Sequence, residues 1–544
     1  MRASLHVRRD VPVIIGLGIL AALAHGVNVF DYPAPSLADD EGTYLQQAWS
    51  VLREGRLSPY TYTYDHVPGG WLQIAGWLGL VGPRAFGSIA DTARVFILVL
   101  HVGAVVLLFI AARRMGAPRL GAGLAAGLFA ASPLALFYGR LVVLENVMMF
   151  WLVASLALIV AVRAPYGVAL GGVAFGIAIL SKEPALVLLP AYALLVVSHV
   201  TTARLRHVAL LIVPALAIAS LYPAYALANG AFWPSGQIAL RPVDPRAYGG
   251  ASLLDSLIWQ VSRPGGNPFD ASSELRIAIT DWLRRDALLV VGGVAASFRN
   301  LLRERRRSWT TPVGVLGLVA FGFLARGGIV YPFHVGLALP FLALNLGIAS
   351  GDLLVRVRLP HAVAVRALAP LALAAFWIAS GLPRLYFDHP GEASRAATRW
   401  IEDALPTDAV IVGGDDLWAE LHEPDALGRG FPAYHSYWRL AYDANARRAA
   451  LPSGWRSIRY VVVSVGLLDS VVRTTRDEAL LDALRNARLV ARWTTPTTDS
   501  GLHPKQVLEL WRVDEAATTE TGVCDDETSI VCAHLANART SEVK

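Results

Sequence analysis

The chain has 544 residues, of which 55% are hydrophobic and 17% charged, and its formal net charge is +6. A soluble globular protein carries more charge than this, so the composition excludes a soluble enzyme and predicts a protein with several membrane spans. The positive charge belongs largely to arginines in short loops between apolar segments, which indicates membrane orientation and not nucleic-acid binding.

Apolar segments long enough to cross a bilayer recur along the membrane part of the chain. They lie at 12–29, 92–112, 119–138, 143–162, 166–181, 184–199, 207–228, 311–325, 329–349 and 362–382, with a shorter one at 286–300. Together they predict about eleven transmembrane helices. The cationic start before the first segment is similar to a signal peptide, but no small-residue cleavage site follows, so we expect a retained first helix.

The arginines of the short loops give the expected orientation of these helices. With a cytoplasmic N-terminus, the inner loops contain Arg113, Arg114, Arg119, Arg163, Arg204, Arg206, Arg299, Arg303, Arg305, Arg306, Arg307, Arg356, Arg358 and Arg366. Cytoplasmic loops of membrane proteins are rich in arginine and lysine. We therefore expect loops 30–91 and 229–285, and everything after residue 382, on the outer side of a plasma membrane.

Three consecutive carboxylates, Asp39, Asp40 and Glu41, open the first outer loop. A carboxylate cluster at a membrane surface is costly to desolvate and repels itself, so it usually marks a site that handles protons, cations or polar substrate. A solvated acidic turn is the alternative. The sequence EGTYLQQAWSVLRE that follows places aromatic and apolar side chains on one helical face, which predicts a helix in the membrane interface.

Further charged and aromatic residues stand on the other outer turns. They are Asp65 and His66 in YDHVPGGW, Arg140 and Glu145 in FYGRLVVLEN, Lys182 in ILSKEPAL, and Arg326, Tyr331 and His334 in ARGGIVYPFHVGLALP. An ionisable group at the end of a span is expensive to keep there and is usually functional. The structural alternatives are a pair between Glu145 and Arg140, a local pair between Lys182 and Glu183, and a helix end capped by Arg326.

An α/β pattern begins where the hydropathy drops, after residue 382. EASRAATRWIEDAL and DEALLDALRNA predict helices, and DAVIVGG, RYVVVSVG, RLVARW and KQVLELWRV predict strands. Residues 383–513 are therefore expected to form an outer α/β domain of about 130 residues. Residues 514–544 are acidic and poor in large apolar groups, which predicts a disordered tail. The only two cysteines, Cys524 and Cys532, lie there, and the sequence leaves their pairing open.

The order of these motifs resembles the GT-C superfamily of membrane glycosyltransferases. A first span, an acidic D-E pair opening a long outer loop with an amphipathic helix, and a (D/E)-(H/K)-x-P-type segment are typical of that superfamily. The protein O-mannosyltransferases and the lipid A aminoarabinose transferases are similar in pattern. The resemblance covers residues 11–382, within an expected catalytic membrane domain at 1–382, and extends to ATRWIEDALPTDAVIVGGDDLW in the outer domain.

The resemblance implies an inverting glycosyltransferase that moves a sugar from a polyprenyl-phosphate carrier to an extracytoplasmic acceptor, which can be a protein, a lipid or a cell-wall glycan. Such a reaction needs a base for the acceptor hydroxyl and cations for the departing phosphate. The catalytic residues it implies are Asp40 as the base, Glu41 and Asp65. The phosphate-binding residues it implies are His66, Arg140, Lys182 and Arg326. Further candidates are Asp39, Glu145, Tyr331 and His334.

Two features of the sequence leave the mechanism open. Val67 stands between His66 and Pro68, which departs from the family pattern and shifts its register. A divalent cation held by Asp40 and Asp65 is neither required nor excluded by the sequence. A transporter or lipid flippase is the alternative function, but it predicts internal repeats and interrupted helices, which the sequence lacks. A non-catalytic scaffold would leave the outer-facing charged residues unexplained.

Overall fold

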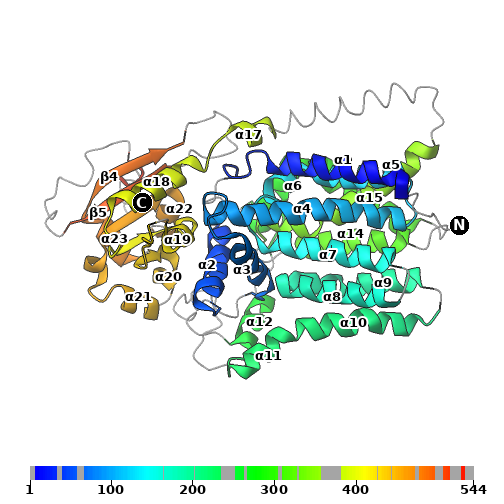
Figure 1. Cartoon of the computed structure of the whole chain (residues 1–544), viewed down its shortest axis with the longest axis horizontal. Helices are drawn as coiled ribbons and strands as arrows, with labels where there is room; N and C mark the ends of the chain where they lie inside the picture. Colours follow the sequence, from blue (N-terminus) through cyan, green and yellow to red (C-terminus); the bar gives the residue numbers. More distant parts are fainter. Residues whose placement is uncertain are drawn as a thin grey trace.

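The fold is described from a computed structural model of the chain. The structure describes residues 7–33, 39–57, 66–162, 165–200, 202–233, 252–262, 266–271, 273–303, 309–326, 330–356, 382–425, 427–442, 444–471, 477–495, 507–514 and 529–532. Figure 1 shows a bundle of helices at one end and a domain built around a sheet at the other, with the helices α2 (Asp39–Glu54) and α3 (Gly69–Val81) between them.

The bundle consists of apolar helices that run side by side (Figure 1). They are α1 (Val7–Gly26), α4 (Ile89–Arg114), α5 (Arg119–Ala131), α7 (Leu144–Ala161), α8 (Pro165–Ser181), α9 (Leu189–His199), α10 (Arg204–Ala219), α13 (Glu274–Leu302), α14 (Thr310–Ala325) and α15 (Leu339–Arg356). Within the described residues, 4 helical stretches are long and apolar enough to cross a membrane, and shorter apolar helices accompany them. The predicted polytopic helical membrane fold is confirmed. The expected count of eleven spans is not confirmed, and the segment at 362–382 lies almost entirely outside the described residues.

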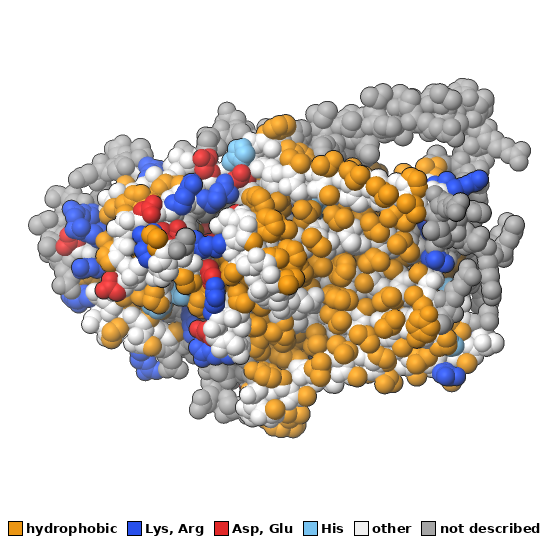
Figure 2. Space-filling model, in the orientation of Figure 1, with side chains coloured by type: hydrophobic (Ala, Val, Ile, Leu, Met, Phe, Trp, Pro, Cys, Tyr) orange, Lys and Arg blue, Asp and Glu red, His pale blue; other side chains and the backbone are white. Residues whose placement is uncertain are grey.

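Small residues let the helices of the bundle approach closely. A Cβ at Gly172 would lie 2.4 Å from the carbonyl oxygen of Leu211, and one at Gly176 would lie 2.7 Å from that of Ala215, so α8 meets the backbone of α10 there. Small residues at helix contacts are typical of membrane bundles, where packing replaces the hydrophobic effect between helices. Figure 2 shows the complementary feature, a broad apolar surface along the bundle with charged side chains gathered towards its two ends.

The helices break where the sequence supplies a proline or a buried carboxylate. The segment predicted at 119–138 is divided between α5 and α6 (Pro133–Tyr138), because Pro133 starts a new helix after Ser132. In α13 the backbone of Asp286 leaves the helical region, with φ −150° and ψ 65°. The Ser132 hydroxyl donates to the Asp286 carboxylate at 2.6 Å, so the two breaks contact each other. The span predicted to start at residue 286 therefore starts at a kink.

Short helices cover the end of the bundle that faces the C-terminal domain. They are α2 (Asp39–Glu54), α3 (Gly69–Val81), η3 (Glu183–Leu188), α11 (Leu221–Ala228), α12 (Leu253–Ser262) and η5 (Pro332–Leu337). The helix predicted after the acidic cluster is α2, but it differs from the expected interfacial helix. Both Gln46 and Gln47 are fully buried, and the Gln46 amide donates to the Ser436 hydroxyl of the C-terminal domain at 3.4 Å.

The C-terminal domain contains a five-stranded sheet with the order β2-β1-β3-β5-β4. Its strands are β1 (Ile411–Gly413), β2 (Tyr434–Ser436), β3 (Tyr460–Ser464), β4 (Ala487–Thr494) and β5 (Val507–Val513). The strands β1, β2 and β3 are parallel, and β5 is antiparallel to both β3 and β4. Its helices are α18 (Glu392–Ala404), α19 (Asp415–His422), α20 (Tyr437–Tyr442), α21 (Ala444–Ala450), η6 (Gly454–Ser457), α22 (Val465–Asp469) and α23 (Glu478–Arg485), preceded by α17 (Leu382–Phe387). The four predicted strands and two predicted helices are present, and β2 is an addition.

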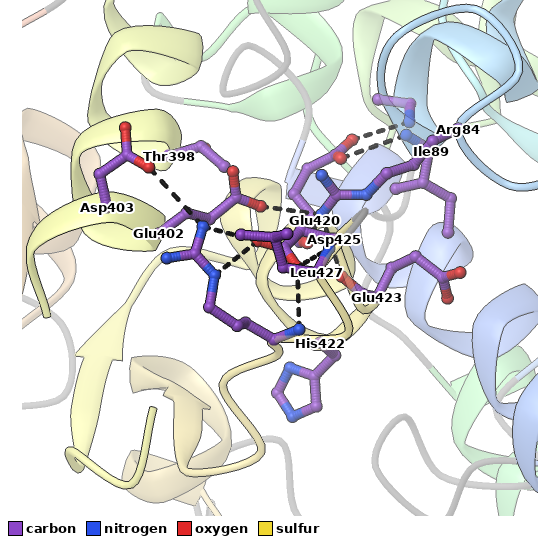
Figure 3. Close-up of polar contacts among 12 residues, drawn as sticks. Arg84, Ile89, Thr398, Glu402, Asp403, Glu420, His422, Glu423, Asp425 and Leu427 are labelled. Carbon is purple, nitrogen blue, oxygen red and sulfur yellow. Dashed lines mark hydrogen bonds and ion pairs between the residues drawn. The ribbon is translucent and has the colours of Figure 1, made fainter. Parts of the chain in front are cut away.

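The C-terminal domain is bonded to the start of α4 (Figure 3). The Glu420 carboxylate accepts from the backbone N–H groups of Ile89 at 3.1 Å and Ala90 at 2.8 Å. The Arg84 guanidinium donates to the carboxylate of Glu402 at 2.9 Å and to the carbonyl oxygen of Glu423 at 2.9 Å. The first N–H groups of a helix have no partner within the helix, so a carboxylate from another domain is a favourable cap.

A short piece of the predicted tail packs against the sheet. Ser529 donates to the buried Glu509 carboxylate at 3.0 Å, and the N–H of Ile530 donates to it at 3.0 Å. Cys532 takes part in a disulfide, while Cys524 lies outside the described residues. Most of 514–544 also lies outside them, so the disordered tail stays a prediction.

Candidate functional site

Described members of the predicted site come from α2, α7, the start of η3 and η5. Figure 1 shows α2 between the bundle and the C-terminal domain. The side chains that meet there are carboxylates, cations and aromatic rings. They divide into a buried ion pair on α2 and a cluster around Lys182.

The buried ion pair joins Glu41 to Arg94 of α4. The guanidinium donates from Nε to Oε1 of Glu41 at 2.9 Å and from Nη2 to Oε2 at 2.8 Å, and each side chain is 1% exposed. Arg94 also donates to the carbonyl oxygens of Val29 and Pro33, and the N–H of Val142 donates to Glu41 at 3.0 Å. This arrangement attaches the first turn of α2 to the end of α1 and to the turn before α7.

The second group of residues is centred on Lys182, which is 4% exposed. Its Nζ lies 2.5 Å from Oε1 of Glu145 and 3.4 Å from the hydroxyl of Tyr44. His334 Nε2 lies 3.4 Å from the same Glu145 oxygen, and the Phe333 ring centroid lies 5.8 Å from Nζ. Four separate elements therefore contribute to one cluster.

The electrostatics of this cluster keep the lysine charged. Burial lowers the pKa of Lys182, but the carboxylates of Glu145 and Asp40 raise it, and the net shift is upward. Asp40 is half-buried at the start of α2. The attraction of these carboxylates offsets the cost of removing the Lys182 ammonium group from water. The alternative local pair between Lys182 and Glu183 is not the one observed, since Lys182 pairs with Glu145.

His66 lies just before α3, and its ring is next to the Glu183 carboxylate. His66 Nδ1 is 3.4 Å from Oε2 of Glu183, and the other Glu183 oxygen accepts from the N–H of Val67 at 2.9 Å. The Tyr44 and His66 rings meet at their edges with centroids 6.1 Å apart. The Tyr222 hydroxyl donates to the His66 carbonyl oxygen at 3.0 Å. The Tyr44 side chain therefore contacts both His66 and Lys182.

Arg140 is buried but has a different set of partners from Lys182. Its Nη2 donates to the carbonyl oxygen of Ala24 at 2.7 Å, and its guanidinium lies 5.2 Å from the ring centroid of Tyr386. The alternative pair between Arg140 and Glu145 is not observed among the contacts of the described residues. Arg140 holds the end of α1 against α17 in this structure.

Arg326 and Tyr331 are both exposed. Arg326 follows α14, is exposed, and stacks over the Phe323 ring with 4.2 Å to its centroid. Tyr331 is 42% exposed and precedes η5, where its ring stacks on Phe333. The structure thus places Arg326 at a helix end, which is the alternative that the sequence offered.

A metal site is not formed by the described residues, since no group of three or more His, Cys, Asp and Glu side chains within the described part could hold an ion. Asp65 and the side chain of Asp39 lie outside the described residues. The predicted cation on Asp40 and Asp65 therefore stays a prediction.

Sequence reasoning missed Arg94 and the phenyl ring of Phe333. Arg94 had a usable signal, since it stands in the outer part of a span, against the positive-inside trend, as Lys182 does. Phe333 had none, because an aromatic residue in an apolar turn is ordinary.

Comparison with known proteins gives one family match and several structural ones. Residues 74–224 match the family described as dolichyl-phosphate-mannose-protein mannosyltransferase. No curated protein sequence matches the chain. The fold is similar to that of ArnT from Cupriavidus metallidurans bound to undecaprenyl phosphate, with a TM-score of 0.56, 16% identity, and 93% of this chain and 98% of that chain covered.

Two structures of the oligosaccharyltransferase from Archaeoglobus fulgidus are also similar. The form tethered with an acceptor peptide has a TM-score of 0.55 and 12% identity, covering 88% of this chain and 72% of that chain. The complex of AglB with an inhibitory peptide and a dolichol-phosphate has a TM-score of 0.53 and 12% identity, covering 94% and 77%. These matches confirm the resemblance in fold to the GT-C membrane enzymes.

Proposed function

We propose that this chain, whose membrane domain has the fold of the GT-C glycosyltransferases, transfers a sugar from a polyprenyl-phosphate carrier to an acceptor on the outer side of the membrane. The observation that carries the proposal is the buried Lys182, whose charge is maintained beside Asp40 and Glu145 at the outer end of the bundle. A prenyl carrier keeps its tail in lipid while its phosphate meets the protein at that level. The ligands of ArnT and AglB in their solved structures support this choice.

The proposed reaction is a single in-line displacement. The acceptor hydroxyl oxygen attacks the anomeric carbon, and its proton passes to the Asp40 carboxylate. The bond between that carbon and the phosphate oxygen breaks on the opposite face, and the phosphate leaves with the electron pair, which inverts the anomeric configuration. Lys182 stabilises the charge that grows on the phosphate, which favours the transition state over the ground state.

The neighbouring residues then have distinct proposed roles. Tyr44 and His334 line the phosphate position through their contacts with Lys182 and Glu145. Glu41 is proposed as a residue that fixes the first turn of α2, because both of its oxygens are already bonded to Arg94. Asp65 stays proposed as the residue that orients the acceptor, and His66 as a phosphate-binding residue, as the resemblance implies.

The orientation and acceptor are also proposals. The arginine-rich loops support a cytoplasmic N-terminus and an outer C-terminal domain. The acceptor can be a protein hydroxyl, a lipid or a cell-wall glycan. The transporter alternative receives no support from the matches in fold.

The test of the function is transfer from a synthetic polyprenyl-phosphate sugar by the purified protein. We expect wild-type turnover, and we expect Asp40→Asn to lower kcat by about 100- to 10,000-fold, the usual contribution of a general base. Carrier binding, measured separately, should change little, because asparagine preserves the shape of the site. Wild-type-like turnover of Asp40→Asn would move the base to another carboxylate, and an inert wild type would remove the proposed function.

A further inference from the structure

The contact between α2 and α19 of the C-terminal domain includes the first turn of α2, which carries Asp40. Several side chains along α2 donate hydrogen bonds to the C-terminal domain. The Thr43 hydroxyl donates to Oδ2 of Asp415 at 2.9 Å, and the indole N–H of Trp49 donates to Glu423 at 2.9 Å. The Arg53 guanidinium donates to the same Glu423 carboxylate at 2.9 Å.

The closest approach in this contact is between backbones, at Gly42. A Cβ at Gly42 would lie 2.5 Å from both the carbonyl carbon and the carbonyl oxygen of Asp415, and 2.8 Å from the nitrogen of Asp416. These atoms are backbone and cannot rotate away. A side chain at residue 42 therefore requires α2 and α19 to separate, whereas glycine permits the observed fit.

Asp415 is held in place from its own domain as well. It is 3% exposed at the start of α19, and the Trp438 indole N–H donates to the same oxygen that Thr43 contacts. One carboxylate oxygen thus bonds a residue of α2 and a residue of the C-terminal domain. The position of the α2 backbone is then determined by the domain and not only by the membrane bundle.

The residues just before Gly42 face the opposite way, towards the bundle. Glu41 bonds Arg94 and Asp40 lies near Lys182, while the Gly42 backbone packs against that of Asp415 and Thr43 bonds the Asp415 carboxylate. The first turn of α2 is therefore held between the helix bundle and the C-terminal domain. A shift of the C-terminal domain would move Asp40 relative to Lys182, which is attached to a different element.

We propose that the C-terminal domain, through Asp415 and the close backbone contact at Gly42, is a positioning element for Asp40 in the sugar transfer reaction. This inference rests on the proposed function. Misplacing a catalytic group by about 1 Å can cost about 100-fold in rate, so a modest separation of α2 from α19 is sufficient for a large effect. Asp415 and Gly42 act through Asp40 and touch no substrate themselves.

The test compares Gly42→Ala with the matched variant Gly76→Ala on α3, where an added Cβ meets nothing within 4 Å. We expect Gly42→Ala to lower kcat by about 10- to 100-fold, with a much smaller change in KM for the carrier. We expect Gly76→Ala to behave as wild type. Equal kcat values for the two variants would overturn the proposal.

A second pair of variants separates positioning from general destabilisation. Asp415→Asn keeps an oxygen that accepts from Thr43 and Trp438, so we expect it to retain turnover, whereas Asp415→Leu should lose it. A loss of equal size in both variants would contradict the positioning role.

A readout independent of activity is hydrogen exchange of the amides in residues 39–46. It should rise in Gly42→Ala and Asp415→Leu but not in Gly76→Ala, and unchanged exchange would overturn the contact itself. If the wild type transfers no sugar from any polyprenyl-phosphate carrier while exchange responds as expected, the proposed function fails and the contact stands.

Discussion

The buried ion pair between Glu41 and Arg94 makes a quantitative prediction about stability. Arg94→Met removes a guanidinium that bonds both oxygens of Glu41 and two backbone carbonyls, within a site where each side chain of the pair is 1% exposed. Methionine fills much of the volume but leaves the Glu41 carboxylate buried without its cation. Breaking a buried pair by removing one partner costs about 3–5 kcal/mol.

Thermal unfolding of the purified protein in one detergent, at one scan rate, measures this cost. The control is Arg485→Met, which removes an exposed partner of Asp482 on α23, a type of pair that contributes about 0–1 kcal/mol. We expect Arg94→Met to lower Tm far more than the control does. A Tm within the range of the control would refute the reasoning.

The double variant Glu41→Leu with Arg94→Met sharpens the test. It removes both charges, so no unpaired charge stays buried, and we expect it to be more stable than Arg94→Met alone. If the double variant is the less stable one, Glu41 contributes through other contacts, and the pair is not the reason for its burial.

The remaining predictions concern the cations and the pH dependence of domain contact. Lys182→Ala should depress transfer strongly and also lower Tm, because it leaves the buried Glu145 carboxylate without its cation. Arg140→Ala should lower Tm through the loss of its bonds to backbone carbonyls of α1 and of α17. The double variant Lys182→Ala with Glu145→Leu should recover Tm relative to Lys182→Ala but not transfer; turnover and Tm of each variant test this, and a double variant less stable than Lys182→Ala would contradict it. Burial raises the pKa of Glu420 from 4.5 to about 7, against the opposing effect of the Ala90 and Ile89 N–H groups. A raised pKa in the folded state means that the contribution to stability is fully present below pH 4.5 and is lost as the pH rises towards 7. We therefore expect the difference in stability between wild type and Glu420→Gln to change across this range and to be constant above it, as followed by thermal unfolding; a flat difference would refute the assignment.

Local patterns in the sequence predicted the elements of the fold well. The helix α2 begins with an acidic cluster and has an apolar periodicity, β3 contains a continuous run of valines, and β5 is rich in apolar residues, so each carries its own signal. The strand β2 has three residues, Tyr434 to Ser436, with a histidine in the middle, and such a short polar strand has no periodicity to detect. Its formation depends on pairing with β1, which is a tertiary effect.

The site was predictable as a set of residues but not as a set of pairs. Asp40, Lys182 and Glu145 stand on turns that the sequence predicts to be outer, where unusual charge is visible. Their partners come from elements far apart in the chain, as in the bond between Lys182 and Tyr44, 138 residues apart. Spacing in one sequence contains no information on such contacts, so the pairing of Lys182 with Glu145 and the different role of Arg140 required the structure.

The cap on α4 has a consequence for how the protein is made. The N–H groups of Ile89 and Ala90 are bonded by Glu420, which lies 331 and 330 residues later in the chain. A ribosome completes the second long apolar helix, and the membrane receives it, long before Glu420 has been synthesised. The start of α4 must meanwhile satisfy these two N–H groups with water or lipid head groups, and it exchanges them for the carboxylate only when the last domain arrives. Truncation before α19 would thus leave the membrane part inserted but with this helix start permanently in its immature, solvated form.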